Sequence, residues 1–247
     1  WLLPYKDAID KRHEMIAQTR DRLSVNGSLA KAMNNHIYYG LHRNEKGSWI
    51  FREWAPNATK IYIIGEFNNW KRTEAYALRP IGGGNWEIEL PSMFLDHGTL
   101  YKLYIEWKGG GAERLPAYLT RAVQDPVTKT FCAQVWDPAT KYEWKNAAPG
   151  KRPHPLIYEC HIGMAAEEEK VGTFEEFRLN VLPKVAELGY DTLQIMALQE
   201  HPYYGSFGYQ VANFYALSSR FGTPEEFKAL VDEAHGLGIA VVMDIVH

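Results

Sequence analysis

The chain has 247 residues, of which 46% are hydrophobic and 23% are charged, and its formal net charge is −3. This is the composition of an ordinary globular protein, and the length suits one large domain or two smaller ones. The small negative charge argues against a nucleic-acid partner, because such proteins carry a basic surface. No apolar run is long enough to span a bilayer, so we expect no membrane partner either.

Two features of the sequence bear on location. The cysteines Cys132 and Cys160 lie far apart and lack metal-ligand spacing, which is typical of small buried residues in a reducing compartment. Residues 1–4 lack the charged and long apolar regions of a signal peptide. We therefore expect a cytoplasmic protein.

Residues 1–35 have the pattern of a helical segment. Apolar side chains recur at roughly helical spacing from Leu2 to Leu23, and Asn26-Gly27-Ser28 interrupts the pattern. The segment is too short for a core of its own, so we expect a helical lead-in that packs against something larger.

Residues 36–140 have the pattern of a β-sandwich. Short runs rich in β-branched and aromatic residues alternate with turn signals. Two runs of three glycines lack the lysine of a phosphate loop, which favours hairpin turns. The predicted strands are residues 38–41, 49–54, 60–65, 85–90 and 100–107, and the turns are residues 44–47, 55–57, 82–85 and 109–111.

Residues 141–155 read as a linker, and residues 156–247 then alternate between strand and helix patterns. Thr173 and Glu176 form the capping box of the first helix, and Pro183 predicts a break within it. The predicted strands are residues 156–161, 190–195 and 239–247, and the predicted helices are residues 174–188 and 224–237.

This alternation indicates a parallel α/β unit that stops after its third strand. A doubly wound sheet of three strands would be thin, and a (β/α)₈ barrel needs about 250 residues for itself. We therefore expect the first β/α units of an incomplete barrel, and hence the N-terminal part of a longer enzyme.

The active site of such an architecture lies at the carboxyl ends of its strands. One strand leads into a loop, residues 200–210, that contains three tyrosines, a phenylalanine and two glycines. These aromatic rings either pack onto the fold or offer flat faces to a sugar. Asp244 follows a nearly apolar strand, where a carboxylate needs a partner. It can bind a ligand hydroxyl, orient a sugar, cap a missing helix or form a structural hydrogen bond to neighbouring loops.

The histidines do not indicate a metal site. No spacing among them matches a metal-binding signature, and His235 is placed where the end of a helix accommodates it. No nucleophile elbow, Cys-His pair or dinucleotide fingerprint is present, so we expect neither metal nor cofactor. The histidines considered are His161, His201, His235 and His247.

Several motifs together resemble the α-amylase superfamily, and more closely the eukaryote-like 1,4-α-glucan (glycogen or starch) branching enzymes. The resemblance covers nearly the whole chain from about His36. Its motifs are Arg52-Glu53-Trp54-Ala55-Pro56-Asn57-Ala58, Gly65-Glu66-Phe67-Asn68-Asn69-Trp70, Ile157-Tyr158-Glu159-Cys160-His161-Ile162-Gly163, Tyr203-Tyr204-Gly205-Ser206-Phe207-Gly208-Tyr209-Gln210, Ser219-Arg220-Phe221-Gly222-Thr223-Pro224-Glu225-Glu226 and Asp244-Ile245-Val246-His247.

The resemblance implies a retaining double displacement on an α-1,4-glucan. An Asp nucleophile takes a chain segment, a Glu serves as acid and base, and a 6-hydroxyl of another chain accepts the segment to form an α-1,6 branch. The family places both carboxylates on later barrel strands, so they are expected after residue 247. We therefore expect no catalytic residue in this chain and no activity from this fragment alone.

The substrate-binding residues carry over from the resemblance. Tyr209 matches the tyrosine that stacks under the sugar at the cleaved bond, and Asp244 matches the aspartate that orders the site. Trp70 and Lys102 match glucan-binding positions of a starch-binding module, and Trp107 is a candidate second platform. Alternatively, the module only stabilises the barrel and does not bind glucan. Further candidates in the aromatic loop are His201, Tyr203 and Tyr204.

Two other functions fit parts of the sequence. An α-1,6 debranching hydrolase has a similar architecture, although residues 203–210 and 244–247 look like the branching type. A non-catalytic glucan-binding scaffold becomes the better account if 247 residues are the whole protein. The sequence does not fix the oligomeric state, for which a monomer is favoured.

Overall fold

The computed structural model describes residues 1–247, and the chain divides into two compact units, residues 1–39 and 40–247. The first unit is helical, as predicted. Asn26 and Gly27 have φ values of 50° and 74°, a left-handed turn that separates the long helix from the short ones. None of the helices has the length and apolar character needed to cross a bilayer. The elements are a 3₁₀ turn (Leu3–Tyr5), α1 (Lys6–Leu23), α2 (Leu29–Ala32) and α3 (Asn35–Tyr38).

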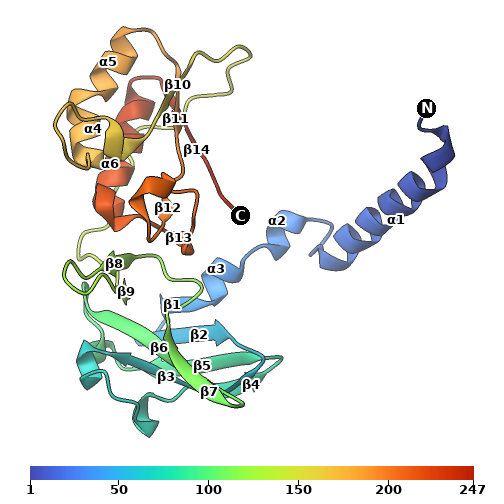
Figure 1. Cartoon of the computed structure of the whole chain (residues 1–247), viewed down its shortest axis with the longest axis vertical. Helices are drawn as coiled ribbons and strands as arrows, with labels where there is room; N and C mark the ends of the chain where they lie inside the picture. Colours follow the sequence, from blue (N-terminus) through green and yellow to red (C-terminus); the bar gives the residue numbers. More distant parts are fainter. The chain divides into compact units, whose positions relative to one another are not determined.

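The second unit begins with two antiparallel sheets that form the predicted β-sandwich (Figure 1). One sheet has the order β1-β2-β5-β4, and the other has the order β3-β6-β9-β8 with β7 added to β6. The strands are β1 (Gly40–Arg43), β2 (Trp49–Trp54), β3 (Ala58–Gly65), β4 (Arg79–Gly82), β5 (Asn85–Leu90), β6 (Leu100–Trp107), β7 (Gly110–Arg114), β8 (Ala122–Gln124) and β9 (Phe131–Gln134).

The core of the sandwich follows from alternation along its strands. Inward side chains of β2 and β6 are buried while their neighbours face outward, as the two-residue period of a strand requires. Phe51 packs edge-on against Tyr101, with ring centroids 6.3 Å apart, and both are buried. Ile61, Ile63 and Leu103 are completely buried between the sheets.

The two glycine runs both lie at hairpins, as predicted, but one strand of each hairpin was missed. The first run turns between β4 and β5, where Gly84 has φ 81° and a Cβ would lie 2.8 Å from Pro56. The second run only begins a turn, because β7 already starts at Gly110. The strands β4, β7, β8 and β9 were not predicted.

The predicted linker has no regular element, yet it is fixed to helix α6 (Pro224–Gly236). The buried carboxylate of Asp232 accepts hydrogen bonds from the Tyr142 hydroxyl at 2.8 Å, from Lys145 N–H at 3.0 Å and from Asn146 N–H at 2.8 Å. Burial would raise the pKa of Asp232, but these donors together lower it to about 2.

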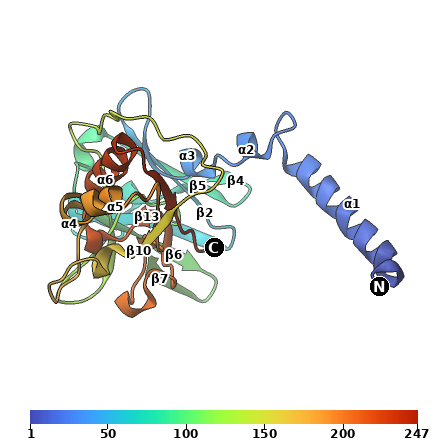
Figure 2. The same ribbon diagram turned by 90° about the horizontal axis from the view of Figure 1, so that it is seen from above.

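The last part of the chain forms the predicted parallel sheet, with strand order β10-β11-β14. Helices α4, α5 and α6 cover one face of it in both views (Figures 1 and 2). The predicted capping box of Thr173 and Glu176 is confirmed, and the helix does break at Val181, just before Pro183. The elements are β10 (Ile157–Cys160), α4 (Phe174–Asn180), α5 (Leu182–Glu187), β11 (Thr192–Ile195) and β14 (Ala240–Met243).

A hairpin that the sequence did not predict joins the sandwich to this sheet region. Its strands are β12 (Gln199–Glu200) and β13 (Asn213–Leu217), and the aromatic loop runs between them. Ala216 is buried within the sandwich core, and Leu217 bridges Arg121 beside β8. The aromatic loop is thus held by a hairpin that packs on the sandwich.

Candidate functional site

The carboxyl ends of β11 and β14 bring together the two residues singled out by the sequence. The Tyr209 hydroxyl donates to Asp244 Oδ2 at 2.8 Å. This hydrogen bond, and then burial, raises the pKa of Tyr209 above its ordinary value. Tyr209 remains 44% exposed, so one face of its ring is available to a ligand while its hydroxyl is held.

Gln194 holds the other oxygen of the Asp244 carboxylate. Its Nε2 donates to Asp244 Oδ1 at 3.4 Å and to Glu159 Oε1 at 3.2 Å. The backbone N–H of Asp244 also donates to the carbonyl of Ile195 at 3.0 Å. Asp244 therefore has a partner on each carboxylate oxygen, which fixes the plane of the group at the mouth of the strand.

Gly208 allows the aromatic loop to reach this position. Its φ is 89°, and a Cβ there would lie 2.0 Å from the carbonyl oxygen of Ala197. Only glycine tolerates both the left-handed backbone and this close approach. The residue that follows, Tyr209, is thereby placed over the end of the sheet.

A buried ionic cluster holds the start of the loop. Glu200 is completely buried, and its carboxylate accepts from His201 N–H, from Ser218 and Ser219, and from Arg220. The Arg220 guanidinium also donates to the carbonyl oxygens of His201 and Pro202 and to Gln124 Oε1 of the sandwich, at 3.2 Å. A buried charge pair with this many partners fixes the loop and ties it to β8.

His201 is completely buried, so its side chain is not part of the exposed surface on which the sequence placed it. Its Nδ1 lies 2.9 Å from the Gln199 carbonyl oxygen. Tyr204 also faces the interior, edge-on to the buried His161 with ring centroids 5.9 Å apart. Burial, and then the neighbouring His201, lowers the pKa of His161. These rings support the loop from below.

Tyr203 has the opposite environment. It is 62% exposed, and its ring lies over Gly205, where a Cβ would come within 2.6 Å of it. Of the three tyrosines in the loop, Tyr203 and Tyr209 are exposed, whereas Tyr204 is partly buried against the core of the sheet region.

On the sandwich, the structure brings together two of the three predicted residues. Lys102 Nζ lies 5.8 Å from the centroid of the Trp70 ring, and it also pairs with Glu113 at 2.9 Å. Trp107 lies five positions after Lys102 along β6, a distance of about 17 Å. Because this separation is odd, the Trp107 side chain points to the opposite face of the sheet from Lys102. Trp107 instead lies beside Arg114, with 5.6 Å between the guanidinium and the ring centroid.

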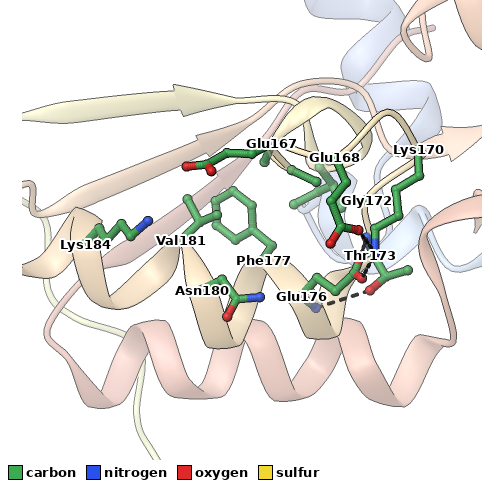
Figure 3. A pocket seen from close by; sticks show the side chains of 13 residues that line it. Glu167, Glu168, Lys170, Gly172, Thr173, Glu176, Phe177, Asn180, Val181 and Lys184 are labelled. Carbon is green, nitrogen blue, oxygen red and sulfur yellow. Dashed lines mark hydrogen bonds and ion pairs between the residues drawn. The ribbon is translucent and has the colours of Figure 1, made fainter.

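A cavity of about 370 Å³ lies away from all these residues, between the loop after β10 and helices α4 and α5 (Figure 3). Phe177 and Val181 line its apolar floor. Lys170 at its rim is neutralised by Glu168 at 2.7 Å and Glu176 at 2.6 Å. The cavity therefore lies on the helix side of the sheet and not at the strand ends.

No group of three or more His, Cys, Asp or Glu side chains has an arrangement that would hold a metal ion. The strand ends present a carboxylate, a phenol and exposed aromatic rings. Such groups bind and orient a polyhydroxylated ligand.

Sequence reasoning missed three residues that hold this site, namely Gln194, Glu200 and Arg220. Gln194 lies between the apolar Leu193 and Ile195, and Glu200 comes two residues after the apolar Ala197-Leu198. A polar group within a buried strand needs a partner, so this signal could have found both. Arg220 lies within a motif of the family resemblance, but its partners come from distant parts of the chain.

Comparison with known families agrees with this architecture. Residues 38–126 match carbohydrate-binding module 48 (isoamylase N-terminal domain), and residues 179–247 match the catalytic domain of alpha amylase. The first match lies on the β-sandwich, and the second lies on the region of the parallel sheet and its helices. The predicted fold class is confirmed.

Along its full length the chain is similar to 1,4-alpha-glucan-branching enzymes. That of Yarrowia lipolytica is 40% identical over 256 residues, that of Dictyostelium discoideum 40% over 254 and that of Aspergillus oryzae 41% over 257. Each comparison covers 100% of this chain and 37% of the relative. The resemblance to branching enzymes is confirmed, and the chain spans little more than a third of their length.

Solved structures show the same fold. A putative alpha amylase from Salmonella typhimurium superposes with a TM-score of 0.69 and 27% identity, over 84% of this chain and 32% of that one. A pullulanase from Bacillus acidopullulyticus has a TM-score of 0.68 at 18% identity, over 84% of this chain and 29% of that one. The second likeness concerns the fold alone.

Proposed function

We propose that the protein containing this chain is a 1,4-α-glucan branching enzyme. It cleaves α-1,4 bonds of glycogen or a related glucan and transfers the released segment to a 6-hydroxyl. The observation that carries the proposal is the similarity to branching enzymes over 100% of the chain. The pairing of Tyr209 with Asp244 at the strand ends supports it, because it prepares a binding surface where barrel enzymes act.

In this proposal the chain supplies the substrate side of a retaining double displacement. The ring of Tyr209 stacks under the sugar at the cleaved bond, Asp244 orders the site, and Tyr203 contacts an outer sugar. His201 and Tyr204 support the loop from its buried side. The nucleophilic Asp and the acid/base Glu come from residues after 247, and no metal or cofactor takes part.

The full-length protein, incubated with amylose, tests the reaction class. We expect new α-1,6 linkages by proton NMR and loss of iodine staining while the number of reducing ends stays constant. Reducing ends that rise without new branches would establish an α-1,6 or α-1,4 hydrolase instead. Residues 1–247 alone should leave iodine staining unchanged, and glucan binding without chemistry by the full-length protein would establish a scaffold.

We propose that the sandwich binds glucan through Trp70 and Lys102. Trp70 is 38% exposed, with a cation beside its ring, which suits the apolar face and hydroxyls of a sugar. Trp70→Ala should weaken binding to immobilised glycogen about fivefold to tenfold, since an aromatic contact contributes about 1 kcal/mol. Trp107→Ala, on the other face, is the matched control. A module that only braces the barrel would lose melting temperature and keep its affinity.

The remaining parts of the proposal concern organisation. We assign residues 1–35 to a helical segment, 36–140 to the sandwich, 141–155 to the linker and 156–247 to the incomplete barrel. Free Cys132 and Cys160 support a cytoplasmic location in a reducing compartment. The protein works as a monomer, which its gel-filtration mass tests. It has no nucleic-acid or membrane partners.

A further inference from the structure

The face of the parallel sheet that points away from the helices carries a polar row. Tyr158 and Cys160 of β10 pack toward the helices, so Glu159 between them points to the other face. Gln194 has the same orientation on β11, because Leu193 and Ile195 are buried in the core. The two residues are partners in the parallel register of the strands.

The Gln194 amide bridges two carboxylates. It donates one N–H to Glu159 Oε1 at 3.2 Å and the other to Asp244 Oδ1 at 3.4 Å. Asp244 Oδ2 in turn accepts from Tyr209 at 2.8 Å. One continuous chain of hydrogen bonds therefore runs from the exposed carboxylate of β10, across β11, to the aromatic loop.

The charges of Glu159 and Asp244 together decide which way the Gln194 amide points. An ionised carboxylate can only accept hydrogen bonds, so it requires the NH₂ end of the amide. With that end fixed, the second N–H is available to Asp244. A neutral glutamine at position 159 removes one of these two requirements, and its own N–H groups can donate to the carbonyl oxygen of a rotated Gln194 amide, so the NH₂ end is held toward Asp244 less firmly.

We propose that Glu159 is a positioning residue for the glucan site, acting through Gln194 to fix the Asp244 carboxylate and, through it, Tyr209. This rests on the proposed function, because the rings and carboxylate that it positions are the proposed substrate contacts. Glu159 takes no proton and touches no substrate in this role. Its effect falls on turnover, because a reacting sugar that is displaced slightly loses rate steeply.

Kinetics in the full-length protein test the action of Glu159. Glu159→Gln, which is isosteric and at an exposed position, should lower kcat about tenfold and leave KM within about twofold. Gln194→Met should lower kcat at least as much, and the double variant should equal Gln194→Met alone. Glu187→Gln, an exposed glutamate at the end of α5, is the matched control and should match the wild type.

A second measurement tests the bridge without any activity. With glutamine-selective ¹⁵N labelling, assigned through Gln194→Met, both side-chain amide protons of Gln194 should resonate downfield of those of a free glutamine, because each is donated to a carboxylate. In Glu159→Gln these two proton signals should move toward those of a free glutamine amide. An amide that does not respond to Glu159 overturns the proposal, as does a kcat of Glu159→Gln equal to that of the control or a double variant in which the two losses multiply.

The two proposals fail separately. The kinetic assay records both branches formed and reducing ends released, so a protein that only hydrolyses glucan overturns the proposed function. The effect of Glu159→Gln on that hydrolysis, together with the amide proton signals of Gln194, then decides the inference. A protein with neither activity overturns both, because Glu159 would have no reaction to assist.

Discussion

At the residue scale, Tyr209 combines two tasks in one side chain. Its hydroxyl is held by Asp244, and its ring remains partly exposed at the end of the sheet. A phenylalanine in its place would keep the ring and lose the hydrogen bond, whereas an alanine would lose both. The two substitutions therefore separate stacking from positioning.

We expect Tyr209→Ala to lower kcat/KM of the full-length enzyme about a hundredfold and Tyr209→Phe about tenfold. The free energy of unfolding should fall by about 1 kcal/mol or less in both, because the ring is 44% exposed and one hydrogen bond is lost. Steady-state kinetics and urea denaturation measure the two effects. A loss of stability that accounts for the loss of activity would make Tyr209 a packing residue.

At the element scale, the linker and α6 are joined by one carboxylate. Asp232 has a pKa of about 2 in the folded chain against an ordinary value of 3.8. Its ionised carboxylate therefore contributes fully to the free energy of unfolding above about pH 4. As the pH falls through this window the carboxylate must be protonated, and the stabilisation that it supplies is lost.

Asp232→Asn should therefore unfold at a lower temperature than the wild type near pH 7. The difference between their melting temperatures should shrink as the pH falls from 4 to 2, since the asparagine does not titrate in this range. Circular dichroism melting curves across this range measure it. A difference that stays constant with pH would show that the hydrogen bonds, and not the charge, hold the linker.

The strands that sequence reasoning located to the residue are those whose own pattern defines them. The bounds predicted for residues 49–54, 85–90 and 100–107 agree with β2, β5 and β6, because each alternates and ends at a turn signal. The three residues of β8 and the two of β12 have no such pattern. They pair because the rest of the fold places a partner beside them.

In the candidate site too, the sequence indicates single residues but not the contacts between them. Asp244 is visible in the sequence because a carboxylate ends an apolar strand, and the aromatic loop is visible by composition. Their contact joins residues 35 positions apart, and the buried state of His201 depends on Phe221 and Arg220 packing around it. Trp107 has the right residue type for a platform but the wrong parity along β6 to join Trp70.

At the scale of the whole molecule, the Glu200 cluster connects the sandwich to the barrel segment. Its partner Arg220 reaches Gln124, and Arg121 of the sandwich donates to the Gly222 carbonyl at 2.8 Å. The two parts of residues 40–247 therefore share partly buried polar contacts as well as the apolar contact of Ala216.

Glu200→Ala should lower the free energy of unfolding by about 3–5 kcal/mol, because it leaves Arg220 without its buried partner. Urea denaturation, followed separately by sandwich tryptophan fluorescence and far-ultraviolet circular dichroism, should show the coupled transition moving to lower urea. Glu45→Ala, at an exposed turn, should change stability by about 0.5 kcal/mol or less. An equally small effect at position 200 would show that the cluster contributes little.

The hydrogen bonds between the linker and Asp232 also have a consequence for synthesis on the ribosome. Its carboxylate is made 86 to 90 residues after the linker groups that it binds. At translation rates of about 5–20 residues per second, the linker waits roughly 4–18 s for its anchor. During that interval the linker after the sandwich is not yet bound to α6, and the strands of the sandwich can pair before the barrel segment emerges. The sandwich can therefore form first, and the linker is bound to Asp232 afterwards.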